Sequence, residues 1–195
     1  MRSAKVNRRT LETDITGSIE LDSQAESSIQ TGIAFLDHML LLFSRHGGLT
    51  LNLDATGDLE VDTHHTVEDI GIVIGQLIAR AAGDKRGIRR YATEIIPMDE
   101  ALVQVVADVS GRPYLVFNAE FSSPTVGAFE TQMTGEFFRA VAYNAGLTLH
   151  ISCLYGNNDH HIIEAVFKAF GRCLKTALAI DPASPDTIPS TKGIL

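Results

Sequence analysis

The sequence predicts an α+β fold that consists of two copies of one β-β-α-β-α module, arranged as two mixed sheets with packed helices. Two repeated segments are the main reason. HHTVE at residues 64–68 returns as HHIIE at residues 160–164, and GLTLNL from Gly48 returns as GLTLHI from Gly146. The matches keep their order along the chain, at offsets of 96 and 98 residues. We therefore infer an internal duplication.

A third likeness extends the repeat toward the N-terminus. DITGS from Asp14 resembles DVSGR from Asp108 at an offset of 94 residues. Each segment lies between alternating apolar runs around a Gly, as strands joined by a turn do. We expect one domain, residues 1–195, whose two repeats span roughly 1–92 and 93–195.

One amphipathic helix is predicted after each HH pair, because apolar residues recur there at helical spacing. These positions are Val67, Ile70, Ile74, Leu77 and Ile78 in the first copy and Ile163, Val166, Phe167, Phe170 and Leu174 in the second. Asp62 or Thr63 can cap the first helix, and Asn158 or Asp159 the second. Each HH pair therefore lies in a first helical turn, soon after a strand.

The other helix of each copy is expected at residues 33–46 and 131–144. The segments ALVQVVADV, from Ala101, and PYLVFNAEF, from Pro113, are rich in β-branched and aromatic residues and predict strands. Two such halves packed on each other make an α+β domain.

The composition argues against several classes of protein. Hydrophobic residues make up 45% of the chain, as in ordinary globular domains. The 24 acidic residues outnumber the 16 basic ones, and the net charge of −8 opposes a broad nucleic-acid interface. The apolar runs are too short for a signal peptide or a membrane helix. Cys153 and Cys173 have no CxxC spacing, so we expect a cytoplasmic protein whose thiols pack in the core.

The HHxxE segments have the residue types and the spacing of metal ligands. Successive helical residues point about 100° apart, whereas residues i and i+4 share one face. His64 and Glu68 can therefore face one ion while His65 faces another. The second segment repeats this geometry with His160, His161 and Glu164. Imidazoles and carboxylates without thiolate suit six-coordinate Mn or Fe, although the residue types also admit Zn, Ni and Co.

The duplication also predicts two further ligands. An offset of 98 residues places His38 of the first copy opposite Glu136 of the second, and both residue types bind metals. His46 and His150 are weaker candidates. His46 precedes a Gly-Gly pair where a helix should end, so a cation there can meet the carbonyl end of the helix dipole. His150 shares a strand face with polar residues.

Two basic features stand out from the acidic background: DKRGIRRY at residues 84–91, and Arg112. The C-terminal segment adds hydroxyl, amide and ammonium groups that can surround a phosphate. These candidates are Ser190, Thr191 and Lys192. Lys168, at i+4 from Glu164, should lie near the metal ligands. Each feature alone is equally compatible with solvated charges or a frayed terminus.

Six segments resemble, in order and over nearly the whole chain, the imidazoleglycerol-phosphate dehydratase family: GIAFLDHML, DTHHTVEDIGI, PMDEAL, SGRPYLV, DHHIIEAVFKAFGR and PSTKG. The resemblance implies a lyase of histidine biosynthesis that dehydrates D-erythro-imidazole glycerol phosphate to imidazole acetol phosphate, with two Mn²⁺ ions per active site. It also implies modules of the ribosomal S5 domain 2-like fold and a homo-oligomer of twenty-four subunits, with active sites at subunit interfaces.

The resemblance assigns roles to individual residues. The implied metal ligands are His38, His64, His65, Glu68, His160, His161 and Glu164. The implied substrate contacts are Glu12, Arg90, Arg112, Lys168, Ser190 and Lys192. Many members of the family have HFF where this chain has EFF at Glu136, a departure that keeps a metal-binding residue type and that the internal repeat pairs with His38.

The implied chemistry begins at the imidazole ring of the substrate. The C2 proton is not acidic and hydroxide is a poor leaving group. Metal ions that stabilise the imidazolate would let the ring electrons expel the C1 hydroxyl and form a diazafulvene-like intermediate. Glu12 is the expected base for the C2 proton, and Glu68 or Glu164 can carry the proton of the hydroxyl.

Two alternatives remain open from the sequence. A binuclear hydrolase would also use paired ions, although it would need more bridging carboxylates. A protein without catalytic activity could use the same ions to join subunits. The repeat symmetry predicts two ligand groups: His64 with Glu68 and His161, and His160 with Glu164 and His65.

Overall fold

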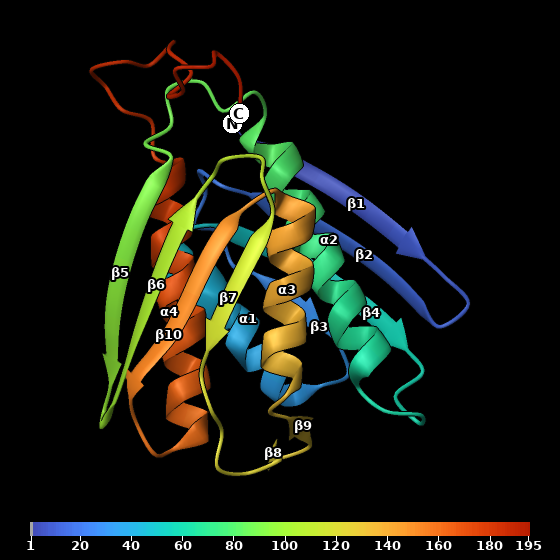
Figure 1. The fold of residues 1–195 in the computed structure, drawn as a ribbon. Helices are drawn as coiled ribbons and strands as arrows, with labels where there is room; N and C mark the ends of the chain where they lie inside the picture. The colour runs from blue at the N-terminus through green and yellow to red at the C-terminus, as the bar shows by residue number, and fades with distance from the viewer. Residues whose placement is uncertain (1) are drawn as a thin grey trace.

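The computed structural model describes residues 2–195, and Figure 1 shows two sheets with helices between them. The first half contains β1 (Ser3–Arg9), β2 (Thr13–Glu20), β3 (Ser28–Gln30), α1 (Ala34–Gly47), β4 (Thr50–Gly57) and α2 (His64–Ala82). The second half contains β5 (Tyr91–Met98), β6 (Ala101–Asp108), β7 (Tyr114–Asn118), β8 (Thr125–Val126), β9 (Phe129–Glu130), α3 (Met133–Ala145), β10 (Thr148–Tyr155) and α4 (Asp159–Leu178). The helices expected at residues 33–46 and 131–144 are confirmed to within two residues at each end, and the two HH-bearing helices begin where they were expected.

Each half of the chain forms one four-stranded mixed sheet. The strand order is β1-β2-β4-β3 in the first sheet and β5-β6-β10-β7 in the second. In both sheets the first three strands run antiparallel to one another in turn, and the fourth is parallel to its neighbour. The predicted α+β class with two mixed sheets is therefore confirmed. In each module three strands of the four-stranded sheet precede the first helix, one more than predicted, and the second module adds the short hairpin β8-β9.

The strand pairings correct the third sequence likeness. β1 pairs with β2, and β5 with β6, in the same register when 88 residues are added, so Glu20 corresponds to Asp108. DITGS lies inside β2, where Gly17 is part of the ladder. DVSGR begins at the end of β6, where Gly111 turns with a φ of 74°. The match at an offset of 94 was wrong because similar letters occupy different places in the two hairpins.

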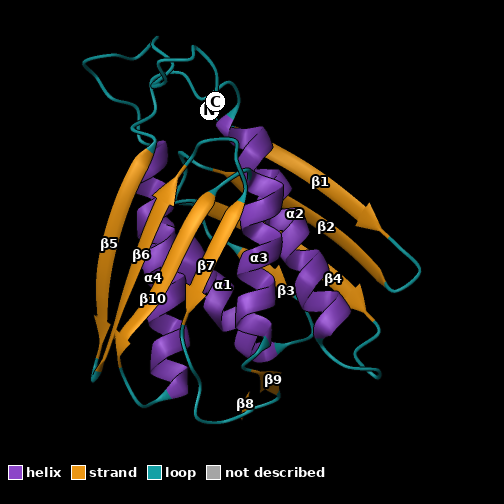
Figure 2. Ribbon diagram, viewed as in Figure 1, coloured by secondary structure: helices purple, strands orange, loops and turns teal. Residues whose placement is uncertain are grey.

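Helices from the two halves pack against each other between the sheets (Figure 2). α2 packs on α3, and α1 packs on α4. Glycines permit this close approach. A Cβ atom on Gly75 would lie 2.8 Å from the carbonyl oxygen of Val141, and one on Gly171 would lie 2.6 Å from that of Phe43. Gly75 and Gly171 differ by 96 positions, so the duplication repeats the same helix contact.

The start of each HH-bearing helix is fixed by a side chain of the preceding loop. Asn158 caps α4 by accepting hydrogen bonds from both N–H groups of the HH pair. Asp62, rather than Thr63, accepts the N–H of His64 at the start of α2. The cysteines are free thiols, with Cys173 buried as expected and Cys153 half-buried. These hydrogen bonds fix the backbone of each HH pair in the first turn of its helix, close to the end of the preceding strand.

Candidate active site

His38, His160 and Glu164 come together where α1 begins beside α4. His160 Nε2 lies 3.2 Å from Glu164 Oε2, and His38 Nε2 lies 3.6 Å from the same oxygen. Among residues 2–195, this is the one group of three or more His, Cys, Asp and Glu side chains whose ligand atoms lie within 4.8 Å of one another. Two helices from different halves of the chain therefore build one candidate metal site.

The two oxygens of the buried Glu164 have different partners. Oε2 faces the two histidines, and Lys168 Nζ lies 2.5 Å from Oε1. Burial raises the pKa of Glu164, but the hydrogen bond and the charge of Lys168 outweigh this effect and bring the pKa below its ordinary value. Glu164 is therefore held as an ionised carboxylate. Lys168 lies beside it, as the i+4 spacing predicted.

The donor set fits a divalent ion such as Mn²⁺. Two donor atoms that lie about 2.1 Å from an ion and at right angles are about 3.0 Å apart. The observed separations of 3.2 and 3.6 Å from Glu164 Oε2 are close to that value. Imidazole and carboxylate donors also serve Fe and Zn, so the donors alone do not select the metal.

The repeat partners of this group are Glu136 on α3 and His64 and Glu68 on α2. They do not form a comparable group within the described part of the chain. Glu136 instead pairs with Arg139, at 2.9 Å, one turn further along α3. The repeat counterpart of Arg139 is Leu41, so His38 has no such competitor at that place. α2 nevertheless packs on α3 as α4 packs on α1. The candidate ligands Glu136, His64 and Glu68 therefore occupy positions on these helices equivalent to those of His38, His160 and Glu164.

The second histidine of each HH pair is bound by a carboxylate. His65 Nδ1 lies 3.0 Å from Asp58 Oδ2, and His161 Nδ1 lies 2.7 Å from Glu100 Oε2. Each hydrogen bond raises the pKa of its histidine. The bond with His161 also lowers the pKa of Glu100 to about 2. In both rings Nδ1 is engaged. Nε2 of His161 lies 3.7 Å from Asp99 Oδ2, beyond hydrogen-bond distance, so this nitrogen can still take a further ligand.

Glu12, the expected base, lies in the turn between β1 and β2. Its Oε2 is 3.8 Å from Nδ1 of His65, and its side chain is 53% exposed. A half-exposed carboxylate beside a candidate metal ligand can reach a substrate bound at that ligand. The structure therefore places Glu12 next to His65, a candidate metal ligand of the first HH pair.

Arg90 and Arg112 converge on Asp108. Arg90 donates hydrogen bonds to both Asp108 oxygens, at 2.7 and 3.2 Å, and to the carbonyl of Pro189 at 2.8 Å. Nη2 of Arg112 lies 3.7 Å from the same carboxylate. The hydrogen bond of Arg90 to Asp108 raises the pKa of its guanidinium. Asp108 therefore holds together the two arginines that were singled out as phosphate ligands.

The C-terminal segment lies against the basic loop at residues 84–91. Backbone carbonyls of Asp186 and Thr187 accept hydrogen bonds from this loop. The bond between Arg90 and Pro189 places the next three residues beside the arginines. These residues are the predicted phosphate ligands Ser190, Thr191 and Lys192. The basic loop and the C-terminal segment are therefore brought together.

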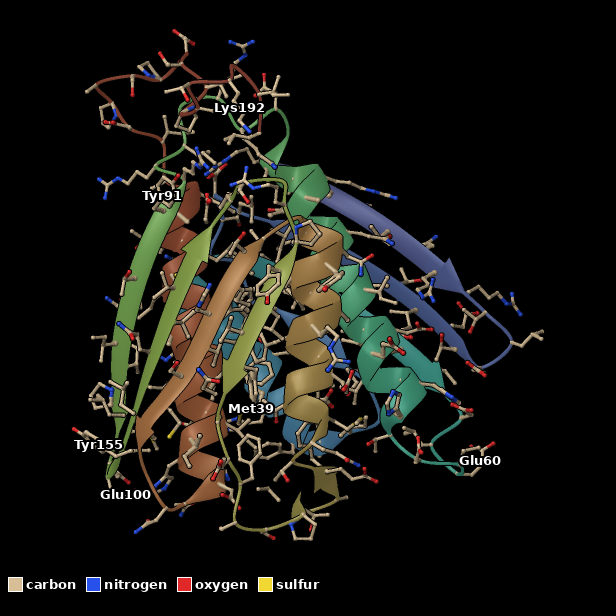
Figure 3. The ribbon with its side chains drawn as sticks, in the orientation of Figure 1. Met39, Glu60, Tyr91, Glu100, Tyr155 and Lys192 are labelled. Carbon is tan, nitrogen blue, oxygen red and sulfur yellow. The ribbon has the colours of Figure 1, made fainter. Side chains whose placement is uncertain are left out.

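The histidine group and the arginine group lie toward opposite ends of α4. Glu164 is in the second turn of α4, whereas the N–H of Arg90 donates to the carbonyl of Ala177 in the last turn. At 1.5 Å per residue, these positions are about 20 Å apart along the helix. Figure 3 shows Lys192 at the opposite end of the molecule from Glu100. One chain therefore cannot offer both groups to the same small substrate.

The two weaker histidine candidates lie outside these groups. Burial, with Lys168 and Arg172 nearby, lowers the pKa of His46. Desolvation and two positive neighbours therefore disfavour a charged His46 at the end of α1. His150 is exposed on β10, in agreement with the polar-face interpretation.

Asp58 and Glu100 are the site residues that sequence reasoning missed. Asp58 has no signal in the sequence beyond its nearness to an HH pair. Glu100 had a usable signal, because the offset of 88 residues between the hairpins places it opposite Glu12. That offset differs from the 94 inferred from the sequence, so the correspondence stayed hidden.

The sequence model of the imidazoleglycerol-phosphate dehydratase family matches residues 31–174, which include every candidate metal ligand. The chain belongs to this family. A relative from Acetivibrio thermocellus with the family's name is 57% identical over 194 residues, covering 100% of this chain and 99% of the relative. Another from Methylorubrum extorquens is 53% identical over 195 residues, covering 100% of each chain. Glu12 and the C-terminal segment fall within these full-length matches.

Two solved structures of the family have the same fold. The dehydratase from Staphylococcus aureus aligns with a TM-score of 0.84 and 51% identity, covering 92% of this chain and 99% of its own. The enzyme from Pyrococcus furiosus, in complex with (S)-C348, aligns with a TM-score of 0.84 and 35% identity, covering 97% and 100%. In residues 2–195, no helix combines the length and apolar character needed to cross a membrane.

Proposed function

We propose that the protein dehydrates imidazoleglycerol phosphate to imidazole acetol phosphate in histidine biosynthesis, with two Mn²⁺ ions in each active site. The observation that carries the proposal is the convergence of His38, His160 and Glu164 in a chain of this family. Family membership supports the reaction, and the donor set supports a divalent metal.

Each ion would be held by ligands of both modules. When bound, the ions would accept the imidazole nitrogens of the substrate and stabilise negative charge on the ring, which favours loss of the adjacent hydroxyl. The ligands of one ion would be His38, His160, Glu164 and His65. The ligands of the other would be Glu136, His64, Glu68 and His161.

Two carboxylates would handle the protons of the reaction. Glu12 would take the C2 proton, because it is half exposed and lies beside His65. On the other side, Glu164, which is paired with the Lys168 ammonium, would carry the proton of the leaving hydroxyl. Glu68 is the repeat counterpart of Glu164 and is the alternative carboxylate for this step.

The phosphate would bind at the arginine group. Arg90 and Arg112 offer charged donors, and the C-terminal segment adds hydroxyl and ammonium groups. These further contacts are Ser190, Thr191 and Lys192. Because they lie about 20 Å from Glu164 along α4, we infer that a second chain supplies them to each metal site. This arrangement supports a homo-oligomer with active sites between subunits. The assembly expected from the family resemblance has twenty-four subunits.

Turnover before and after metal removal tests the proposal. Formation of imidazole acetol phosphate should stop when a chelator strips the assembled protein and should return when Mn²⁺ is restored. Mn²⁺ binding without any product would leave the metal site in place and overturn the proposed reaction. Phosphate release from ester substrates would instead favour a hydrolase, and a metal-dependent oligomer without activity would favour a structural role.

Replacement of the proposed base gives a second test. Glu12→Gln should bind substrate with a similar KM and lower kcat strongly, because the amide cannot accept the proton. A near-normal kcat in this variant would remove Glu12 from the mechanism.

A further inference from the structure

Two carboxylates hold the second histidine of each HH pair by the same ring nitrogen. Asp58 accepts a hydrogen bond from Nδ1 of His65, and Glu100 accepts one from Nδ1 of His161. The two carboxylates come from different elements. Asp58 directly follows β4, whereas Glu100 lies in the turn between β5 and β6, at the tip of that hairpin in Figure 3. The two copies therefore have the same carboxylate–histidine contact, but the carboxylate comes from a different element in each.

The loop before α4 explains why the second copy uses a different residue. Between the strand and the HH pair, this loop is two residues shorter than its counterpart. Gly156 directly follows β10, as Asp58 directly follows β4. A Cβ atom on Gly156 would lie 2.8 Å from Cβ of Ala101, so a side chain cannot be placed there without a shift. Glu100, the neighbour of Ala101, reaches His161 instead.

Both oxygens of Glu100 are engaged. Oε2 binds His161, and Oε1 accepts the N–H groups of Asn157 and Asn158 at 3.3 and 2.8 Å. Asn158 in turn caps α4 through the N–H groups of the HH pair. The carboxylate therefore joins the β5–β6 turn, the loop before α4 and the imidazole ring into one rigid unit.

We propose that Glu100 is a positioning residue that fixes His161 with Nε2 directed to the metal ion, as Asp58 does for His65. A carboxylate that accepts the Nδ1 proton selects the tautomer with a free Nε2, orients the ring and strengthens Nε2 as a donor. The inference rests on the proposed function, since it requires a bound ion.

Two residues at equivalent positions of the two copies, Glu12 and Glu100, have different roles. The offset of 88 residues makes Glu100 the counterpart of Glu12. In the first copy Asp58 holds the histidine, and Glu12 is left half exposed to face the substrate. In the second copy Gly156 leaves no such carboxylate, and Glu100 holds the histidine. The equivalent residues therefore serve proton transfer in one copy and positioning in the other.

Mn²⁺ titration of the metal-stripped, assembled protein tests the proposal, with free Mn²⁺ followed by its electron paramagnetic resonance signal. Glu100→Gln keeps an acceptor for the loop but loses the charge. It should lower the Mn²⁺ affinity of one of the two sites per chain by about 10-fold or more. Carboxylates that hydrogen-bond a metal ligand contribute about 10- to 100-fold to metal affinity. The other ion should bind as in the wild type. Asp58→Asn should lower the Mn²⁺ affinity of the site that contains His65 and leave the site that contains His161 unchanged.

The matched control is Glu60→Gln, which removes the same charge from an exposed position in the loop before α2 (Figure 3). It should leave both affinities within about twofold of the wild type, well under the loss expected for an outer carboxylate. Thermal unfolding and oligomer size should match in all variants. Two tightly bound ions in Glu100→Gln would overturn this inference alone. A wild type that binds no Mn²⁺ would overturn the proposed function as well.

Discussion

Lys168 and Glu164 form an ion pair of 2.5 Å on one face of α4, with the other oxygen of Glu164 turned toward His38 and His160. The lysine therefore occupies one side of the carboxylate and leaves the other side for a metal. Its charge also offsets the effect of burial on the pKa of Glu164. The ion pair keeps a buried ligand ionised without blocking it.

Lys168→Met should make Mn²⁺ binding more sensitive to acid. Without the ammonium group, only the hydrogen bond and charge of His160 still oppose the effect of burial, so the pKa of Glu164 rises and the carboxylate is protonated at a higher pH than in the wild type. The affinity of the variant relative to the wild type should therefore fall as the pH is lowered toward the raised pKa of Glu164, whereas titration of the histidines affects both proteins alike. Lys168→Arg keeps the charge and should follow the wild type. A pH-independent ratio for Lys168→Met would contradict the assigned role.

Mixed oligomers should recover activity from two inactive chains. Glu164→Gln removes a proposed metal ligand, and Arg90→Gln removes a proposed phosphate ligand. Because the two groups lie about 20 Å apart along α4, one active site would take them from different chains. Random co-assembly after unfolding and refolding together should give about one quarter of the sites both intact groups, if each group comes from a single chain. Dehydratase turnover of the mixture measures this.

The control for this experiment is a mixture of two chains with defects in the same group, Glu164→Gln with His160→Gln. It should recover much less activity, because both variants damage the same metal site. Recovery in the control but not in the test mixture would contradict a site shared between the ends of α4.

Asp108→Asn should weaken substrate binding more than catalysis. Asp108 binds Arg90 directly and lies 3.7 Å from Arg112, so its loss lets both guanidinium groups move. A charge-assisted hydrogen bond contributes roughly 1.5–3 kcal/mol, which corresponds to a rise in KM of about 10-fold or more. kcat should change little, since the metal ligands are distant. Arg89→Gln, an exposed neighbour, is the matched control.

The sequence predicted the candidate ligands that the duplication repeats within helices. The HHxxE spacing is copied intact, and the 98 offset that linked His38 to Glu136 follows from equivalent strands and helices. The structure also brings His38 close to His160 and Glu164. This contact could not be seen in the sequence, because His38 is far from the other two residues along the chain. Residue spacing within one helix is fixed by geometry, so these residues could be predicted.

The contacts made by loops could not be predicted in the same way. Asp58 and Glu100 reach their histidines from a loop and a turn, whose conformations depend on packing rather than on a local period. The third strand of the first module, β3, has only three residues and pairs with one neighbour, so its pattern is too short to recognise. The proposed meeting of the arginine and histidine groups from different chains lies beyond any pattern within one chain.

Gly171→Ala should destabilise the fold. The new Cβ atom would lie 2.6 Å from the carbonyl oxygen of Phe43, in the contact between α4 and α1. Such overpacking costs roughly 1–3 kcal/mol, which for a chain of this size lowers the unfolding midpoint by several degrees. Gly135→Ala on α3 is the control, since its Cβ atom would meet only Phe117 at an ordinary distance of 3.7 Å. Equal midpoints for the two variants would contradict the close helix approach.

Glu136→His should change which metal binds best. Arg139 lies 2.9 Å from Glu136 and competes with a metal for its carboxylate. A histidine would end this competition and would replace an oxygen donor by a nitrogen donor, which favours Co²⁺ and Ni²⁺ over Mn²⁺. The ratio of Co²⁺ to Mn²⁺ affinity should therefore rise for one ion per chain, as measured by competition with a chelator.

Two further variants separate the ligand from its ion pair. Arg139→Leu frees the carboxylate of Glu136 and should strengthen Mn²⁺ binding, whereas Glu136→Gln removes the charged ligand and should weaken it. Opposite effects of these two changes are expected only if the carboxylate itself binds the ion. If both variants bind Mn²⁺ as the wild type does, Glu136 is not a ligand, and the second ion depends on His64, Glu68 and His161 alone.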